Sequence, residues 1–262
     1  MRLIHEPLST GRQAVLGVVG VIGVAAVAEL LMRTVVSKEG LPVPSKVLGS
    51  LGDLFADGTF WQAVGFTMAE WMFALLLATI VGVAVGAAMG ASTAAMITFN
   101  LPVEAFRVLP SIALGPILVL LMGNGMLPLS ITVALACVWP ILLNTMYGVK
   151  GADTTAIQTA ESFGLSRSEV VRRVILPSAL PFAFTGVRVA ASIGLIVAVS
   201  AELLVGGGSG IGGYILVGSA NATNLDLVYA ATLVAGVLGV LVSLLMSLID
   251  AKVFDWKKGL AQ

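Results

Sequence analysis

The most restrictive feature of the sequence is its series of long apolar runs, of which the run from Leu227 to Ile249 contains no charged residue. About 20 consecutive apolar residues form a helix long enough to cross the hydrocarbon of a bilayer. Composition agrees with this length argument. Hydrophobic residues make up 58% of the chain and charged residues 11%, and the mean hydropathy is +1.04, whereas soluble domains are about 45–50% apolar. We therefore expect an all-α integral membrane protein.

Composition also excludes several kinds of site. The formal net charge is zero, which gives no argument for a nucleic-acid partner. Cys137 is the only cysteine and His5 the only histidine, so the chain can form no intramolecular disulfide and offers no imidazole cluster for zinc or iron. We interpret Cys137, in an apolar run, as a small packing residue. No metal site is expected.

Six apolar segments are candidate transmembrane helices of a single domain that covers residues 1–262. Their approximate ranges are 14–33, 66–90, 103–122, 128–147, 180–204 and 227–249. The first run follows basic residues and contains Ala26-Val27-Ala28, which resembles a signal-peptidase site, so a cleaved signal peptide is an alternative. We favour an uncleaved span, because the run approaches ~20 residues and a signal core has only ~7 to 15.

The segments around the second and third spans carry more specific expectations. Residues 37–62 are too polar for hydrocarbon, and a helix over 45–55 is expected to rest its apolar face on the membrane surface. Residues 91–100 are expected to form a short polar turn. Pro110 and Pro116 interrupt the third span and predict a broken helix.

Small and acidic residues in these spans have separate interpretations. Gly82 and Gly86, with Gly90 one turn further on, form a doubled small-residue pattern that predicts close helix packing. Glu70 is interpreted as an interfacial anchor near the start of its span, with a proton or substrate role as the alternative. Glu104 is three residues before Arg107, which predicts an ion pair.

A polar stretch separates the fourth and fifth spans, and we call residues 150–179 the coupling hairpin. Asp153 is a good N-cap for a helix over 154–163. Gly164 can adopt the left-handed conformation that commonly ends a helix. The first half of the hairpin is therefore predicted to be a short helix that stops at a glycine elbow, Gly164.

A second helix is expected to follow the elbow. Ser166 and Glu169 form a capping-box pattern at its start, and Pro177 disfavours its continuation. The fifth span is then expected to begin anew, with Ser178 as N-cap and Pro181 in the first turn.

The coupling hairpin resembles the cytoplasmic loop of inner-membrane permeases of ATP-binding-cassette (ABC) importers. That loop has the pattern Glu-Ala-Ala, three residues, Gly, nine residues, Ile, one residue, Leu-Pro. Here the matching positions hold Gln158-Thr159-Ala160, Gly164, Val174 and Leu176-Pro177. Gln158 and Thr159 replace the family's Glu and first Ala, so position 158 offers the ATPase a hydrogen bond and not an ion pair.

Other segments are similar to the nitrate, sulfonate, taurine and bicarbonate permease subfamily. They are Leu41-Pro42-Val43-Pro44-Ser45, Trp139-Pro140-Ile141-Leu142-Leu143-Asn144-Thr145 and Ala201-Glu202-Leu203-Leu204. The resemblance implies the type I ABC importer permease fold, with a cytoplasmic coupling helix that docks on a separate ATPase. The residues expected to couple are Ala156, Gln158, Thr159, Ala160, Glu161, Phe163, Gly164, Leu165, Arg167, Arg172, Arg173, Leu176 and Pro177.

The same resemblance implies the partners. They are a cytoplasmic ABC ATPase dimer, a second permease chain in a homodimer or heterodimer, a periplasmic or lipid-anchored solute-binding protein, and membrane lipid. ATP and Mg are expected in the ATPase, so this chain is expected to hold no cofactor and to be a transport subunit and not an enzyme. The solute is expected to be an oxyanion, a sulfonate or a small heterocyclic compound.

A second set of residues is expected to line a translocation pathway. The candidates are Ser111, Pro116, Trp139, Asn144, Ser200 and Glu202. Asn144 needs a polar partner in its apolar surroundings, and we favour an interhelical hydrogen bond. The glycine-rich run 205–214 lacks the Gly-Lys-Ser/Thr of a phosphate-binding loop. The resemblance suggests instead an external loop that moves with a gate.

The distribution of basic residues predicts the orientation. With the N-terminus inside, nine bases lie on the cytoplasmic side and three outside, which obeys the positive-inside rule. The nine are Arg2, Arg12, Lys150, Arg167, Arg172, Arg173, Lys252, Lys257 and Lys258, and the three are Arg33, Lys38 and Lys46. This predicts a multi-pass protein of the bacterial inner membrane with both termini and the coupling hairpin in the cytoplasm.

Two alternatives belong to other functional classes. An ion-coupled secondary carrier is suggested by the acidic residues in or near the spans, Glu29, Glu70, Glu104 and Glu202, but these fall toward span ends. An intramembrane enzyme would need a nucleophile and base or a set of metal ligands, which His5 alone does not supply.

Overall fold

The computed structural model describes residues 10–34, 42–205, 209–221 and 225–254. Secondary structure in this part of the chain consists of helices, without a strand. The helices are α1 (Thr10–Thr34), α2 (Pro44–Gly49), α3 (Leu51–Ala56), α4 (Gly58–Ala91), α5 (Thr93–Arg107), α6 (Ser111–Met122), α7 (Met126–Lys150), α8 (Thr154–Ser162), α9 (Arg167–Val170), the π-helical turn η1 (Val171–Ile175), α10 (Leu176–Val205), α11 (Gly210–Asn221) and α12 (Leu225–Val253).

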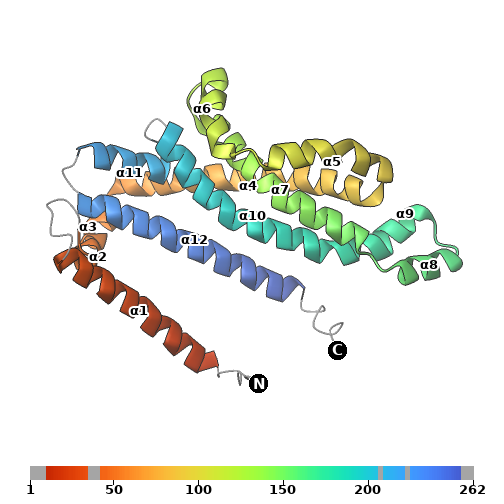
Figure 1. Cartoon of the computed structure of the whole chain (residues 1–262), viewed down its shortest axis with the longest axis horizontal. Coiled ribbons are helices and arrows are strands. Elements are labelled where there is room, and N and C mark those ends of the chain that lie inside the picture. The colour runs from red at the N-terminus through yellow and green to blue at the C-terminus, as the bar shows by residue number, and fades with distance from the viewer. Residues whose placement is uncertain (1–9, 35–41, 206–208, 222–224, 255–262) are drawn as a thin grey trace.

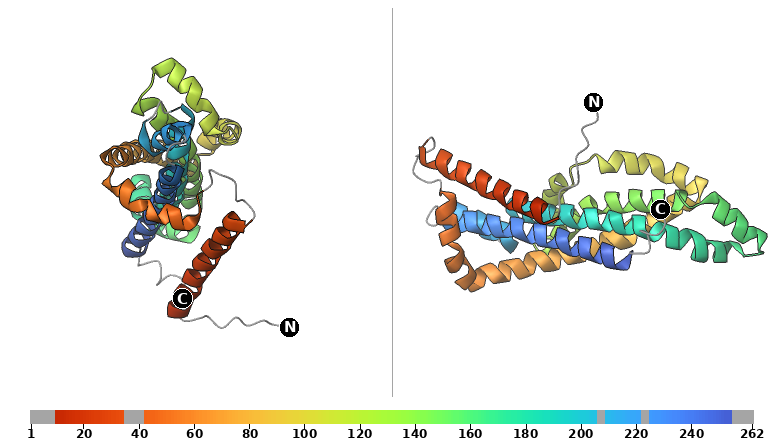
Figure 2. Two further views of the ribbon diagram at one scale, coloured as in Figure 1. Left: turned by 90° about the vertical axis from the view of Figure 1, so that its left-hand side faces the viewer. Right: turned by 90° about the horizontal axis from the view of Figure 1, so that it is seen from below.

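Three long helices, α4, α7 and α10, form the core of the bundle, and they run lengthwise beside one another in Figures 1 and 2. Small residues let these helices approach closely. A Cβ at Gly82 would lie 2.9 Å from the Ile141 Cβ, and one at Gly86 would collide with the Leu142 carbonyl oxygen. Cys137 is fully buried in the same core. The predicted packing roles of these residues are confirmed.

The described residues contain five helices that are long and apolar enough to cross a membrane, and the bent pair α5–α6 is a sixth candidate. In Figure 1, α1 stands apart from the bundle, and its apolar side chains are exposed, for example Val24 at 73%. A helix that is apolar and exposed all round suits a lipid surface. The predicted number of spans therefore fits the fold.

The second span begins earlier than the predicted residue 66. Asp57 caps α4, since its Oδ1 accepts a hydrogen bond from the Thr59 N–H at 2.8 Å. Phe60 then packs into a small cluster with Val47 and Leu54 from the preceding short helices and with Ala230 of α12. One continuous surface helix over 45–55 was also expected, but the chain forms two short helices; their residues Val47 and Leu54 are buried against protein, whereas Leu48 and Phe55 are exposed.

The third span is one sharply bent pair of helices. Residues 91–100, predicted as a turn, are helical from Thr93, because Ser92 caps α5 by accepting from the Ala95 N–H at 3.3 Å. The axes of α5 and α6 differ by 92°, with Pro110 directly before α6. The break predicted at Pro110 is therefore confirmed, whereas Pro116, which was also expected to interrupt the span, lies inside α6.

The fifth span does not begin anew after Pro177. Helix continues from α9 through η1 into α10, and Pro177 and Pro181 lie inside it. The π-turn directly before Leu176 changes the backbone hydrogen-bond spacing at the point where Pro177 supplies no N–H. Ser178 is not an N-cap, because its hydroxyl donates to the Ile175 carbonyl at 2.8 Å.

The glycine-rich run is partly helical. Gly206, Gly207 and Gly208 lie outside the described residues, but α11 begins at Gly210, so the expectation of an irregular loop as far as Tyr214 was wrong. Gly210 has a φ of +72°, which favours glycine. Contacts from α4 and α10 hold the first turn of α11.

Candidate functional site

The coupling hairpin folds as its capping residues predict. Asp153 accepts a hydrogen bond from the Thr155 N–H at 2.8 Å and so begins α8. Gly164 ends the turn after α8 with a φ of +78°, and its N–H donates to the Glu161 carbonyl at 2.9 Å. The glycine elbow is confirmed.

The second half of the hairpin connects the elbow to the core. Ser166 and Glu169 form the predicted capping box at the start of α9. The helical path then runs through η1 into α10, and Val170 is buried at this junction. One helical element therefore joins the glycine elbow to a central helix of the bundle.

Much of the surface of α8 is exposed, although Ala156, Ile157 and Ala160 are half-buried. None of its residues is buried, and the following Phe163 has 80% of its surface exposed. Ala156 and Ala160 lie four residues apart, on one face of the helix. In Figures 1 and 2, α8 and α9 project from one end of the bundle. Small residues beside an exposed aromatic ring form a surface that can enter a groove on another protein.

Most of the remaining hairpin residues that were predicted to couple are exposed. Gln158, Thr159 and Glu161 are exposed on α8, and Leu165 is half-buried beyond the elbow. The basic residues and the last two positions are exposed as well; they are Arg167, Arg172, Arg173, Leu176 and Pro177. Arg173 pairs with Glu169 at 3.5 Å.

The structure does not bring the predicted pathway residues together. Trp139 lines an apolar groove between α4, α5 and α7, whereas Ser200 lines a different groove between α10 and α12. Ser111 begins α6, and Pro116 is exposed on the same helix. Glu202 is fully buried. Within one chain these residues do not outline a single passage.

Asn144 does not make the expected interhelical hydrogen bond. Its Nδ2 donates to the Pro140 carbonyl at 2.8 Å, in the same helix. The side chain can reach that carbonyl because residues four apart lie on the same face of a helix. The predicted ion pair between Glu104 and Arg107 is confirmed, at 2.8 Å.

A buried polar cluster lies where α4, α10 and α11 meet. Glu202 Oε1 accepts from the Thr67 hydroxyl at 2.6 Å, and its Oε2 accepts from the Gly212 N–H at 2.9 Å. The Ile211 N–H donates to Thr67 Oγ1 at 2.9 Å. Glu70, one turn after Thr67, is also fully buried.

The expectation that Glu70 is an interfacial anchor was therefore wrong. Because α4 begins at Gly58, Glu70 lies ~18 Å along the helix and not near its start. Its buried partner, Glu202, is far away in the sequence. Both residues stood out as acidic positions in apolar runs, but no local pattern links them.

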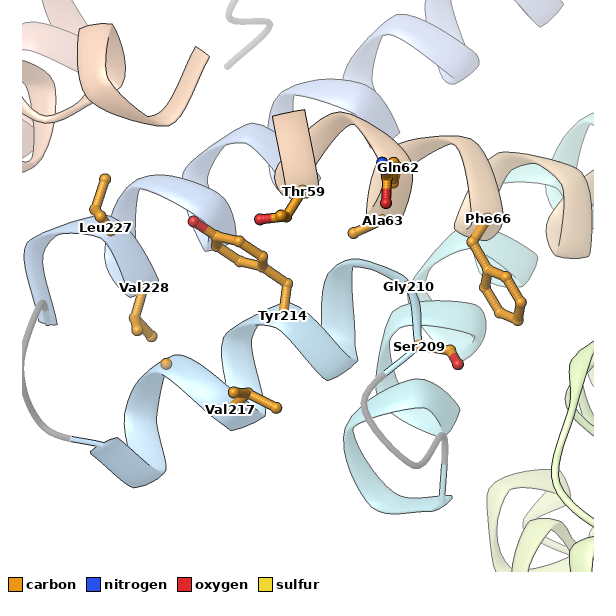
Figure 3. A pocket seen from close by; sticks show the side chains of 11 residues that line it. Thr59, Gln62, Ala63, Phe66, Ser209, Gly210, Tyr214, Val217, Leu227 and Val228 are labelled. Carbon is orange, nitrogen blue, oxygen red and sulfur yellow. The ribbon is translucent and has the colours of Figure 1, made fainter. Parts of the chain in front are cut away.

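A cleft of about 510 Å³ opens beside this cluster, between the first turns of α4, α11 and the start of α12. Figure 3 shows Tyr214 reaching across it toward Thr59, with Gln62 and Phe66 on the same wall and Leu227 opposite. Tyr214 donates a hydrogen bond to Asp57 Oδ2 at 2.9 Å, which links α11 to the cap of α4. The cleft and α8 lie at opposite ends of the bundle (Figure 1).

Comparison with known proteins agrees with the hairpin pattern. A family described as binding-protein-dependent transport system inner membrane component matches residues 82–255. The taurine transport system permease protein TauC of Escherichia coli is 30% identical over 221 residues, which cover 82% of this chain and 80% of TauC. A putative ABC transporter permease protein of Methanocaldococcus jannaschii is 30% identical over 156 residues; the match spans 60% of this chain but only 58% of that relative. Sulfonate, nitrate and bicarbonate permeases match at 25 to 30% identity.

The fold is also found in a solved transporter. A chain of the MetNI methionine ABC transporter, in an inward-facing conformation, superposes with a TM-score of 0.59 at 18% identity, over 73% of this chain and 94% of that one. The fold is thus that of type I ABC importer permeases. Since the family match covers more than half of the sequence, this chain belongs to the family of binding-protein-dependent transport system inner membrane components.

Proposed function

We propose that this chain couples ATP hydrolysis in a separate ATPase dimer to the import of a small solute, and that α8 is its coupling helix. The observation that carries the proposal is the exposed surface of α8 and Phe163, joined through the glycine elbow to α9 and α10. Closure of the ATPase dimer would move α8, and the helical connection would pass that motion to the core. The spans would then alternate between inward-facing and outward-facing states.

The proposed orientation places α8 in the cytoplasm, where ATP is available. Nine basic residues against three favour this side. In Figure 1 the beginning of α1 and the end of α12 point toward the end of the bundle that carries α8, which is consistent with both termini on the cytoplasmic side. We accordingly place the protein in the bacterial inner membrane. Arg2, Lys38, Lys257 and Lys258, which enter this count, lie outside the described residues.

The proposed assembly contains two permease chains, the ATPase dimer with its ATP and Mg, and an external solute-binding protein. One coupling hairpin per chain supports a dimer, and Gln158 in place of the family's Glu leaves both a homodimer and a heterodimer possible. The relatives named for taurine, sulfonate, nitrate and bicarbonate transport support a small anion as the solute. An ion-coupled carrier is not proposed, because the chain belongs to a family of binding-protein-dependent systems.

The proposal can be tested with the chain co-expressed with an ABC ATPase and a solute-binding protein from the same cell. Purified complexes in proteoliposomes should hydrolyse ATP faster when the loaded binding protein is added, and should accumulate solute only with ATP. Phe163→Asp should abolish both activities, because a charge would replace the exposed ring at the docking surface. Uptake that persists without ATP but collapses with an ion gradient would contradict the proposal.

A matched control separates docking from general damage. Leu48 is also an exposed apolar residue, at 59%, but it lies on α2 at the opposite end of the bundle. Leu48→Asp should leave ATPase association intact. Equal loss of association in both variants would indicate that surface charge, and not α8, is responsible.

A further inference from the structure

The two buried glutamates, Glu70 and Glu202, face one another but differ in the hydrogen-bond donors that surround them. Both have no exposed surface, and their carboxyl groups are close enough to interact directly. The ion pairs formed by the described residues all lie elsewhere. A buried carboxylate without a cation needs hydrogen-bond donors, and two facing carboxylates repel one another.

The donors belong to Glu202. One of its oxygens accepts from the Thr67 hydroxyl and the other from the Gly212 N–H. The Gly212 N–H is in the first turn of α11, where the positive end of the helix dipole favours a negative charge. The Ile211 N–H completes the arrangement by donating to Thr67. Glu202 is therefore the position suited to an ionised carboxylate.

Glu70 has the opposite surroundings. Neither Oε1 nor Oε2 receives a hydrogen bond from a donor in the described part of the chain. Ser130 of α7 donates only to the Glu70 backbone carbonyl, at 3.4 Å. A protonated carboxyl gains an O–H donor, which an ionised one lacks. A proton on Glu70 would turn the facing pair from repulsive into hydrogen-bonded.

We propose that Glu70 and Glu202 form a single-proton site. Glu70 holds the proton, and its O–H donates a hydrogen bond to the Glu202 carboxylate, which anchors the first turn of α11. The ligand is the proton itself. Among the described residues of α4, α7, α10 and α11, the other groups at the two carboxyls are the neutral donors of Thr67 and Gly212. Charge balance at the site thus rests on that proton.

The surrounding backbone shows that the anchor is tight. A Cβ at Gly210 would collide with the Glu202 carboxylate, and one at Gly212 would lie 2.7 Å from the Glu202 Cβ. Only glycines let the start of α11 fit over this side chain. Loss of the proton would place two carboxylates under this turn and weaken the attachment of α11, which also forms a wall of the 510 Å³ cleft.

Infrared spectroscopy of the full-length chain in lipid nanodiscs tests the proton directly. At pH 7 the wild-type chain should show the carbonyl band of a protonated carboxylic acid, and Glu70→Gln should remove it. Glu104→Gln, at a half-exposed side chain paired with Arg107, is the control and should leave the band unchanged. A wild-type spectrum without the band, or a band that survives in Glu70→Gln, would overturn the proposal.

Hydrogen exchange at the Ile211 and Gly212 amides tests the anchor. Glu70→Gln should retain protection, since an amide N–H can still donate to Glu202. Glu202→Gln should raise exchange roughly tenfold, because its NH₂ group must face one of the two donors. If Glu202→Gln does not fold, Thr67→Val provides the second variant and should raise exchange at Ile211. Equal opening in Glu70→Gln and Glu202→Gln, unchanged exchange in Thr67→Val, or protection that requires sodium, would contradict a proton site.

Discussion

Glu169 bonds back to Ser166, the N-cap residue of α9. Its Oε2 accepts hydrogen bonds from the Ser166 backbone N–H at 3.0 Å and from the Ser166 hydroxyl at 2.8 Å. The contact fixes the first turn of α9 two residues after the glycine elbow. The angle between α8 and α9 therefore depends on a capping box as well as on Gly164.

Glu169→Ala should loosen this turn without unfolding the bundle. The Ser166 N–H loses its acceptor, so amides over residues 167–170 should exchange severalfold faster, while those of α7 remain protected. Glu161→Ala on exposed α8 has no capping contact to lose and is the control. The result can be read by hydrogen-exchange mass spectrometry, and unchanged exchange in Glu169→Ala would show that the box does not hold α9.

Substitution of the glycine elbow should separate folding from coupling. A Cβ at Gly164 would meet no atom within 4 Å, so only its φ of +78° opposes substitution. Valine in this conformation costs ~1–2 kcal/mol, whereas asparagine enters it more readily. Gly164→Val should insert in the membrane but lose transport-linked ATP hydrolysis, and Gly164→Asn should retain most of it. Normal stimulation by loaded binding protein in Gly164→Val would count against the elbow.

Local sequence patterns were sufficient to predict the structure of the coupling hairpin. Asp153, Gly164 and the Ser166–Glu169 pair each act through residues at most three positions away, so their geometry could be predicted without tertiary information. The length of each apolar run likewise predicted the spans, because bilayer thickness sets the length that a helix needs.

Close packing between α4 and α7 yields a matched pair of variants. Gly86→Ala would place a Cβ against the Leu142 carbonyl and 3.0 Å from the Thr145 Cβ, and overpacking of this kind costs ~1–3 kcal/mol. At Gly65, in the same helix, an added Cβ would meet no atom within 4 Å. Gly65→Ala should be neutral or stabilise by up to ~1 kcal/mol. Thermal unfolding in detergent measures both, and equal melting temperatures would contradict the packing argument.

The features that sequence reasoning missed depend on distant contacts. The start of α11 is held by Thr67 and Glu202 from two other helices, so a glycine-rich run that looked irregular becomes helical. Pro177 was predicted to stop the helix. The π-turn that precedes it could not be anticipated, because it has no simple sequence pattern. The burial of Glu70 depended on where α4 begins, which Asp57 and the packing of Phe60 determine.

The Tyr214–Asp57 contact predicts a pH-dependent link between α11 and α4. Hydrogen bonds from the Thr59 hydroxyl, the Thr59 N–H and the Tyr214 hydroxyl hold the pKa of Asp57 below its usual value. A lowered pKa contributes stability that is present above the unfolded value, ~3.9, and is lost as the pH falls through the folded value. Tyr214→Phe should cost about 1 kcal/mol at pH 7 and less below about pH 4.

Tyr229→Phe, on α12, is the control for this contact, because the Tyr229 side chain is partly exposed and does not bond Asp57. Thermal unfolding across pH 3 to 8 measures the difference between each variant and the wild type. A Tyr214→Phe deficit that stays constant over this range, or that grows in acid, would contradict the assigned role of the Asp57 carboxylate.

The most direct test of the coupling account is photo-crosslinking from position 163 in the assembled complex. Phe163 is replaced by benzoylphenylalanine, and the same probe at Phe55, on α3 at the opposite end of the bundle, serves as the comparison. The account predicts an adduct with the ATPase subunit from position 163 and none from position 55. An adduct from position 163 with the external binding protein, or an ATPase adduct from position 55 alone, would contradict it.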